Sequence, residues 1–335
     1  MQQLLIDPSD KRPKVTQIEQ AIIRDIEKGI LKKDERLPSI SEFSKRYKIA
    51  KDTVEKAYNR LKEDGYLVAV KGKGNFVAEG NNKTIRILMI LNKLSAYKKT
   101  IYDAFVEKLG SAAKVDLQVH HYDPKILKDI LDSNRGKYHY YVVMPHFFHE
   151  VKKDEFLEVV KTIPSHELVV LDKKLDVDDE FMSVYQDFKM DIYNALSSSI
   201  QLFENYQSIT VLFPVLSHHP QEITDGVKLF CKEQRLKFNL IYDVQKVKLK
   251  AGQVYICLVE SELADLIKKI RTSDLEMGKD IGVISFNETV LNELLDITSI
   301  STDFKEMGTT AASLILKKEF KKIHNPYKFI HRASL

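Results

Sequence analysis

Hydrophobic side chains recur at helical spacing through the first eighty residues. Three sets of apolar residues each fall on one helical face: Ile18, Ala21, Ile22 and Ile26; Ile40, Phe43 and Tyr47; and Val54, Ala57, Tyr58 and Leu61. Ser39, with Glu42 three residues later, forms a capping-box pattern just before the second set. A brief turn at residues 48–50 leads to the third set. Two short helices joined by a tight turn, the second amphipathic, predict a helix-turn-helix.

A basic hairpin is predicted directly after these helices. Short apolar runs at 67–70 and 76–77 flank the tetrapeptide Lys71-Gly72-Lys73-Gly74. Such runs around a Gly-rich segment favour a β-hairpin, and a hairpin beside a recognition helix is a wing. A phosphate-cradling nucleotide loop is the alternative. It lacks both the G-x-x-x-x-G-K-[ST] spacing and a following helix.

Residues 79–83 are polar and lack apolar periodicity, so we expect a linker there between a module at 1–78 and a second at 84–335. In the second module, apolar runs alternate with amphipathic segments. The predicted strands are 85–91, 117–121, 138–144, 168–171, 209–215, 238–242, 254–259 and 281–286. The predicted helices are 100–109, 126–131, 156–163, 190–203, 227–234 and 263–270. This alternation predicts an α/β fold with parallel sheets, divided into two subdomains with a cleft between them.

Positive charge is concentrated at one end of the chain. Residues 1–80 hold 17 Lys and Arg against 13 Asp and Glu, whereas the other 255 residues hold 35 of each, so the net charge of +4 belongs to the first module. A small basic module joined to a larger neutral one is typical of a nucleic-acid binder with a separate partner or sensor domain. On charge alone, a solvated basic face is the alternative. A composition of 44% hydrophobic and 30% charged residues excludes general disorder.

Cysteine content and hydropathy bear on the compartment. Cys231 and Cys257 cannot form a disulfide framework, which favours a reducing cytoplasm. No apolar run approaches the roughly 18 residues of a membrane span. Residues 1–10 show no basic cluster before an apolar core, so no signal peptide is visible. We therefore expect a cytoplasmic protein with no membrane partner.

The first module resembles the winged helix-turn-helix of the GntR family. The motifs that carry the resemblance occur in order over about sixty residues: Arg36-Leu37-Pro38-Ser39, Thr53-Val54, Ala57-Tyr58, Leu61, Gly65-Tyr66-Leu67 and Gly72-Lys73-Gly74-Asn75-Phe76-Val77. The resemblance implies a dimeric transcription factor that lays its third helix in the major groove of DNA and its wing in the adjacent minor groove. Where the family often has Ser or Arg, this chain has Ala50, Lys51, Glu55 and Ser41. These departures leave the operator sequence open.

Residues on the polar face of the third helix are candidates for DNA contact. Asp52 can accept a hydrogen bond from cytosine N4, and Lys56 can donate to guanine O6 and N7. Stabilisation of the helix dipole is the alternative role for Asp52, and a solvated side chain is the alternative for Lys56. Other polar groups would hold phosphates. The full predicted set is Ser39, Ser41, Lys51, Asp52, Thr53, Lys56, Lys71, Gly72 and Lys73.

The second module resembles the LacI/GalR-type sensor. The motifs in order are Val169-Val170-Leu171-Asp172, Asp187, the run 280–288, Ile297-Thr298-Ser299-Ile300, Met307-Gly308-Thr309-Thr310-Ala311-Ala312 and His331-Arg332-Ala333-Ser334. A GntR-type head on a LacI-type body is similar to the arabinose-repressor subgroup of the GntR family. This resemblance implies a two-lobed, periplasmic-binding-protein-like effector domain that also dimerises.

Polar residues at strand ends are candidates for an effector pocket. Carboxylates and amides in a cleft suit hydrogen bonding to sugar hydroxyls, and Tyr offers an apolar ring face. Tyr97 also matches the position where the family places an aromatic residue against its ligand. The predicted set is Asn92, Tyr97, His146, Asp172, Lys173, Glu260 and Asn287, each with an ordinary polar loop residue as the alternative.

Three departures from the sensor pattern bear on the kind of ligand that the cleft can bind. Ile223 stands where sugar sensors of the family usually carry an Arg, and Asn287 replaces a common Asp. The segment 245–253 is too short for the helix that usually separates the two flanking strands. The cleft is therefore expected to take an atypical ligand or none.

The sequence contains no complete catalytic or metal-binding pattern. His146 and His149 could present two nitrogens to a metal, but no third ligand accompanies them. No nucleophile elbow, Cys-His signature or zinc-protease motif occurs. We predict a non-enzymatic, homodimeric, one-component regulator without a cofactor, a repressor that binds a palindromic operator under control of a sugar-like effector. The alternatives are a body that only dimerises or docks a protein, and an α/β enzyme with a basic accessory head.

Overall fold

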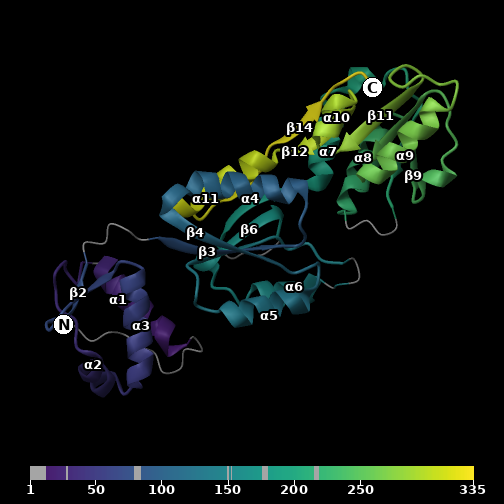
Figure 1. The fold of residues 1–335 in the computed structure, drawn as a ribbon. Helices are drawn as coiled ribbons and strands as arrows, with labels where there is room; N and C mark the ends of the chain where they lie inside the picture. Colours follow the sequence, from purple (N-terminus) through teal and green to yellow (C-terminus); the bar gives the residue numbers. More distant parts are fainter. Residues whose placement is uncertain are drawn as a thin grey trace.

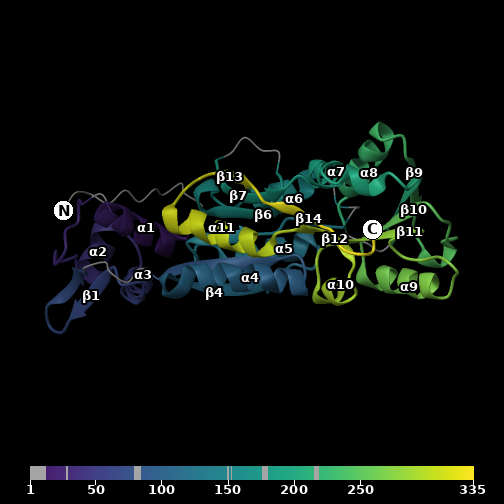
Figure 2. The ribbon, with the colours of Figure 1, turned by 90° about the horizontal axis from the view of Figure 1, so that it is seen from above.

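The computed structural model of the protein describes residues 13–27, 29–78, 84–148, 151, 153–175, 180–214 and 219–335. The expected linker at 79–83 lies outside them. Figure 1 shows a small N-terminal head followed by two α/β lobes in a row, and Figure 2 shows the same order from above. No helix in the described part of the chain is long and apolar enough to cross a bilayer.

The head is a helix-turn-helix followed by a hairpin, as predicted. Its elements are α1 (Lys14–Glu27), α2 (Ile40–Tyr47), α3 (Lys51–Glu63), β1 (Leu67–Val70) and β2 (Gly74–Val77). The two strands are antiparallel, with Leu67 opposite Val77 and Val70 opposite Gly74. The three apolar sets read from the sequence meet in one core, in which Phe43 and Tyr58 are fully buried.

The first lobe is built on a six-stranded parallel sheet of order β13-β7-β6-β5-β3-β4. Helices α4 and α11 cover one face, and α5 and α6 cover the other (Figure 1). The strands are β3 (Ile85–Leu91), β4 (Ala113–Val119), β5 (Tyr140–Val143), β6 (Leu168–Lys173), β7 (Met182–Gln186) and β13 (Lys322–His324). The helices are α4 (Ala96–Leu109), α5 (Pro124–Asn134), α6 (Lys153–Val160) and α11 (Phe304–Lys317).

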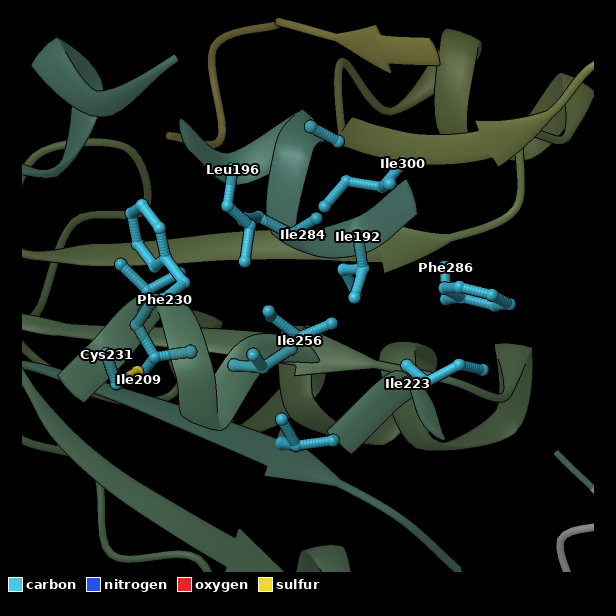
Figure 3. Close-up of a cluster of buried hydrophobic side chains, with 14 of the residues drawn as sticks. Ile192, Leu196, Ile209, Ile223, Phe230, Cys231, Ile256, Ile284, Phe286 and Ile300 are labelled. Atoms are coloured by element: carbon cyan, nitrogen blue, oxygen red, sulfur yellow. The ribbon is translucent and has the colours of Figure 1, made fainter. Parts of the chain in front are cut away.

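The second lobe has a sheet of order β14-β12-β11-β10-β8-β9. The strands are β8 (Ser208–Leu212), β9 (Lys237–Ile241), β10 (Gln253–Cys257), β11 (Ile281–Phe286), β12 (Thr298–Thr302) and β14 (Tyr327–Ile330). The helices are α7 (Phe188–Ser197), α8 (Glu222–Glu233), α9 (Glu260–Arg271) and α10 (Val290–Leu294). Side chains from α7 and α8, including Ile192 and Phe230, pack onto Ile256 and Ile284 of the strands (Figure 3). Cys231 and Cys257 are free and buried in this lobe.

The structure differs from the prediction in four strands that hydropathy does not detect. β12 reads Thr-Ser-Ile-Ser-Thr and is fully buried, because its hydroxyls find partners inside the lobe. Thr298 Oγ1, for example, donates to the carbonyl of Arg332 at 3.0 Å. β7, β13 and β14 are short, and β14 runs antiparallel to β12, so the second sheet is not purely parallel. The segment between β9 and β10 holds only a short 3-10 turn at Val244–Lys246, consistent with its length.

The chain crosses between the lobes three times within the described residues: from β7 to α7, from β12 to α11, and from β13 to β14. These three crossings are hydrogen-bonded to one another. Asn325 Nδ2 donates to Gln186 Oε1 at 3.0 Å and to the Asp303 carbonyl at 3.1 Å. Gln186 Nε2 donates to Asp191 Oδ2 at 2.8 Å. The lobes are therefore joined by a compact, polar hinge.

Candidate DNA-binding surface and effector cavity

Helix α3 presents one apolar and one polar face. Val54, Ala57, Tyr58 and Leu61 are buried in the head. The Tyr58 hydroxyl donates to the Pro38 carbonyl at 2.9 Å, which fixes α3 against the start of α2. On the opposite face, the side chains left exposed to solvent are Lys51, Asp52, Glu55, Lys56 and Asn59, with Thr53 half-buried.

The N-terminus of α3 is open. Ala50 occupies the cap position and makes no side-chain cap hydrogen bond. The first backbone N–H groups of a helix carry partial positive charge and, without a cap, remain available to an anion such as a DNA phosphate. Ser39 behaves differently, because its hydroxyl accepts from Glu42 N at 3.2 Å and its own N–H donates to Glu42 Oε2 at 2.7 Å. Ser39 therefore caps α2, and the predicted capping box is confirmed.

The wing tip is basic and exposed. Lys71, Gly72 and Lys73 all face solvent, and Gly72 has a left-handed φ of 75° that the tight turn requires. Arg36 pairs with Phe76 at the base of this hairpin, and a Cβ on Gly74 would lie 3.3 Å from Arg36 Nε. Glycine at position 74 thus lets the guanidinium lie against the wing. Arg36 is a further exposed cation of this surface, absent from the predicted set although it stands in the motif that carried the resemblance.

A cavity of about 280 Å³ lies where the carboxyl ends of strands from both lobes meet. Its walls come from both sheets and from the crossings. The lining residues are Asn92, Lys93, Ser95, Tyr97, Lys98, Tyr122, His146, Asp172, Phe188, His219, Pro220, Val259, Phe286, Asn287, Thr302 and Phe304. Ligand sites in doubly wound folds lie at this edge of the sheet, and the volume is just below the roughly 300–1,000 Å³ typical of ligand pockets.

A buried ionic cluster forms one wall of the cavity. Lys98 Nζ lies 2.6 Å from Asp172 Oδ2, and His146 Nε2 lies 3.1 Å from the same oxygen. The Lys98 and Asp172 side chains are only 8% and 9% exposed. Burial alone would raise the pKa of Asp172, but Lys98 and His146 outweigh it and hold the pKa well below its usual range. Burial lowers the pKa of His146, so the imidazole is neutral and donates to an ionised carboxylate.

Two buried amides add hydrogen-bonding capacity. Asn92 and Asn287 are 4% and 8% exposed, and the Oδ1 atom of each has no hydrogen-bond partner in the structure. Asn287 has a φ of 72° and Asp172 a φ of 71°, a left-handed conformation that is uncommon for residues other than glycine. Unsatisfied buried oxygens and strained backbone concentrate at binding sites. Both features therefore indicate a candidate binding site. The two unpartnered amide oxygens can accept hydrogen bonds from a ligand.

Aromatic rings complete the walls. Tyr97 stacks on Phe304 with ring centroids 5.0 Å apart, and Phe286 meets His219 edge-on at 5.7 Å. Burial, followed by the charges of Glu260 and Glu288, raises the pKa of Tyr97 to about 12, so its hydroxyl stays protonated. Flat apolar surfaces beside convergent polar groups suit a small ring with a hydroxylated edge.

Five of the seven predicted effector residues line the cavity, and Lys173 and Glu260 do not. Adjacent residues in a strand point to opposite faces, so Lys173 turns away from Asp172 and its Nζ lies 5.4 Å from the centre of the Phe156 ring. Glu260 is exposed as the first residue of α9, next to the lining residue Val259. Both assignments are corrected by this geometry.

The prediction missed residues from α4 and from the crossings. Lys98 lies one position beyond the predicted Tyr97, and only the fold brings it to Asp172. Phe188, Thr302 and Phe304 come from the crossings, which the sequence did not reveal because β7 and β12 were not recognised. Among the described residues, no group of three or more His, Cys, Asp or Glu could hold a metal ion. His149 lies outside the described residues.

Comparison with known proteins supports both halves of this arrangement. The model of the family "Bacterial regulatory proteins, gntR family" matches residues 14–77. The HTH-type transcriptional regulator YurK of Bacillus subtilis (strain 168), itself uncharacterised, is 31% identical over 116 residues, 35% of this chain and 44% of its own length. The HTH-type transcriptional repressor YtrA of the same organism is 30% identical over 131 residues, 39% of this chain and 97% of its own length.

Another relative is the arabinose metabolism transcriptional repressor of Geobacillus stearothermophilus, 32% identical over 71 residues, 21% of this chain and 20% of its own length. The chain thus spans less than half of two of these three relatives.

Solved structures resemble the lobes. A transcription regulator like protein from Staphylococcus haemolyticus superposes with a TM-score of 0.59 at 15% identity, covering 76% of this chain and 99% of that one. A periplasmic binding protein/LacI transcriptional regulator from Alkaliphilus metalliredigens QYMF, complexed with D-xylulofuranose, gives 0.56 at 12% identity, covering 75% and 99%. At these identities the likeness shows the fold, which is that of LacI-type regulators. By its head and by its relatives, the chain belongs to the gntR family of bacterial regulatory proteins.

Proposed function

We propose that the protein is a cytoplasmic one-component repressor, whose affinity for a palindromic operator is set by a carbohydrate effector bound between the lobes. The observation that carries the proposal is the pairing of two complementary sites in one chain. An uncapped, polar-faced α3 beside a basic wing offers a surface for DNA. A cavity with unsatisfied amide oxygens offers a site for a small hydroxylated ligand.

On the head, the candidate DNA-contacting residues would have different roles. Asp52 and Lys56 lie in the first turns of α3 on its exposed face and would reach base edges in the major groove. Lys51, Thr53 and the open helix N-terminus would bind phosphates. Lys71, Gly72 and Lys73 would grip the backbone at the adjacent minor groove, with Ser41 exposed at the start of α2.

In the lobes, each class of cavity group has a carbohydrate counterpart. Asn92 and Asn287 oxygens would accept from ring hydroxyls, as would Asp172 Oδ1, since Lys98 and His146 both contact Oδ2. Tyr97 and Phe304 would lie against the apolar face of the ring. The D-xylulofuranose complex of the Alkaliphilus protein, which has this fold, supports a sugar-sized ligand.

Effector binding would act on DNA through the hinge. Two of the three crossings carry lining residues, and hydrogen bonds join all three, so a ligand that draws the lobes together would also move the crossings. In a dimer, a change in lobe angle re-spaces the two heads. To change operator occupancy substantially, the effector must favour one lobe arrangement by a few kcal/mol.

A homodimer is supported by an apolar surface on the lobes. Helix α10 exposes Val290, Leu291 and Leu294, the last of them 74% accessible, and Leu94 is exposed just before α4. Helices α4 and α10 lie along the same edge of the molecule in Figure 2. Large apolar side chains exposed together on one short helix, as on α10, mark a candidate interface.

Selection of duplexes from a random DNA pool, followed by fluorescence anisotropy on the selected site, tests this function. The proposal predicts an inverted repeat and a weakening of binding when a matching sugar is added. An R36A/K71A double variant should bind the same duplex more weakly, whereas K108Q, at the far end of α4, should bind it as the wild type does. A selected duplex whose affinity no sugar alters would instead favour a body that only dimerises, and failure to enrich any duplex would contradict the proposal.

A further inference from the structure

Among the described residues, the cavity lining holds more positive than negative charge. Its lining residues include two lysines, Lys93 and Lys98, but a single carboxylate, Asp172. Lys98 is neutralised by Asp172 at 2.6 Å, which leaves Lys93 without a carboxylate in salt-bridge distance among the described residues. Of the two carboxylates whose charges reach Tyr97, Glu288 is held by both guanidinium nitrogens of Arg332, at 2.7 and 3.0 Å, and Glu260 is exposed outside the lining.

The N-terminus of α4 adds to this positive potential. The helix has 14 residues and begins at the cavity wall, where Ser95 is its N-cap and lines the cavity. Its first turn contains no acidic residue, so the positive end of the helix dipole is not compensated within the helix. Lys93 is an exposed residue two positions before Ser95 and lines the same cavity, so its positive charge adds to that of the helix N-terminus. Burial and the charge of Lys98 lower the pKa of Lys93, as expected where cations crowd without an anion.

A second, independent feature points to the same ligand. Asn92 of the first lobe and Asn287 of the second both line the cavity. The Oδ1 atom of each is buried and has no hydrogen-bond partner among the described residues. Amide oxygens accept hydrogen bonds only, so they require a ligand with donors, which an anion such as sulfate or chloride does not provide. A ligand that satisfies every group must carry both hydroxyls and a negative charge.

We propose that the effector is an anionic monosaccharide derivative, a sugar acid or a sugar phosphate, with its anionic group at Lys93 and the N-terminus of α4 and its hydroxyls on Asn92 and Asn287. The inference rests on the proposed function, which requires an effector in this cavity, and specifies its chemical class. A volume of about 280 Å³ fits one sugar ring with a single substituent.

Isothermal titration calorimetry of the 335-residue chain with matched probes tests whether the effector must carry a negative charge. The probes are neutral pentoses and hexoses, each beside its phosphate ester and its aldonic or uronic acid, so that the carboxylate and phosphate arms are separated. We expect binding in one or both anionic arms and none by the neutral parent of the binding sugar at the same concentration. Binding of a neutral sugar that is as tight as that of its anionic derivatives would overturn the inference, as would no binding by any probe.

The variant K93Q separates a specific contact from general electrostatics. Because charge-assisted hydrogen bonds are strong, loss of the Lys93 ammonium should weaken binding of the anionic probe by about tenfold or more. K108Q removes the same charge from the last turn of α4, is exposed, and should change the affinity little. Equal affinities for K93Q and K108Q would contradict the site. Operator binding that no sugar alters would contradict the effector part of the proposed function. Operator release by a neutral sugar would contradict only the inference that the effector is anionic.

Discussion

The proposed DNA-binding surface of the head and the cavity between the lobes are built in opposite ways. The head presents a convex surface built from one continuous segment, where Lys51, Asp52 and Lys56 stay exposed because the opposite face of α3 is buried. The cavity is concave and is assembled from strand ends and crossings far apart in the sequence. In the head, the candidate binding groups are exposed on a helix whose opposite face is buried. In the cavity, several candidate groups are buried and contact one another, as Lys98, Asp172 and His146 do.

This contrast explains which residues of the two sites could be predicted from the sequence. Helical periodicity placed α3 and the Ser39 cap, because a helix keeps its binding and packing faces in one short stretch. Strand-end polarity found Asn92, His146, Asp172 and Asn287, since parallel strands deliver their carboxyl ends to one edge. It failed for Lys173, whose face depends on register, and for Lys98, whose partner lies 74 residues away. It could not reach Phe304, because the buried β12 before it is rich in Ser and Thr.

The largest effect is expected from the core of the head. Phe43 is fully buried and packs edge-on against Tyr58, with ring centroids 5.8 Å apart. Replacing it with alanine removes these contacts and leaves a cavity, so F43A should lower the free energy of unfolding of the head by about 3–5 kcal/mol. Hydrogen exchange should show faster exchange in α2 and α3 with unchanged protection in β3 and β11. Equal loss of protection in both lobes would contradict the separation of the two regions.

A comparable but smaller loss is expected in the cavity wall. D172N leaves the buried Lys98 without its partner, which should destabilise the lobes by about 3 kcal/mol in urea unfolding. A K98M/D172L double variant should recover much of this loss, since it removes both charges. The exposed pair of Lys128 and Asp132 is the control, and K128Q should unfold as the wild type does. If D172N and K128Q behave alike, the ionic cluster is not a structural part of the cavity.

Acidification should affect the two regions in opposite directions. Burial raises the pKa of Glu19 in the head to about 7, even though Arg60 lies 3.4 Å away. A raised carboxyl pKa means that the folded head takes up a proton more readily than the unfolded chain, so it gains stability as the pH falls from about 7 to about 5. Burial lowers the pKa of His120 in the first lobe to about 4. The unfolded chain then takes up the proton first, so the lobe loses stability over the same range.

Each of these pH effects should amount to about 2 kcal/mol between about pH 7 and about pH 5. Urea unfolding followed by hydrogen exchange in each region measures them. E19Q should remove the pH response of the head alone. H120N should reduce that of the lobe alone, where His146, with its lowered pKa, acts in the same direction. A response of the same sign in both regions would show that burial does not control these two groups.

The smallest effect is expected at the wing. Lys71 is exposed at the hairpin tip, so its removal costs no packing. K71Q should weaken binding to all DNA sequences about equally. It should also reduce the slope of the logarithm of the association constant against the logarithm of salt concentration by about 1. K56Q, in contrast, should weaken the selected operator by about 1–3 kcal/mol and relax its specificity at one base pair. Anisotropy titrations with the operator and a scrambled duplex distinguish the two patterns.

The most direct measurement is the affinity of the unliganded wild-type protein for its selected duplex across a range of about 50 to 200 mM salt. If α3 and the wing dock on DNA, the logarithm of the association constant falls linearly with the logarithm of the salt concentration, and the slope corresponds to several neutralised phosphates. An affinity that does not change with salt, or a slope unaffected by K51Q and K71Q together, would contradict the account.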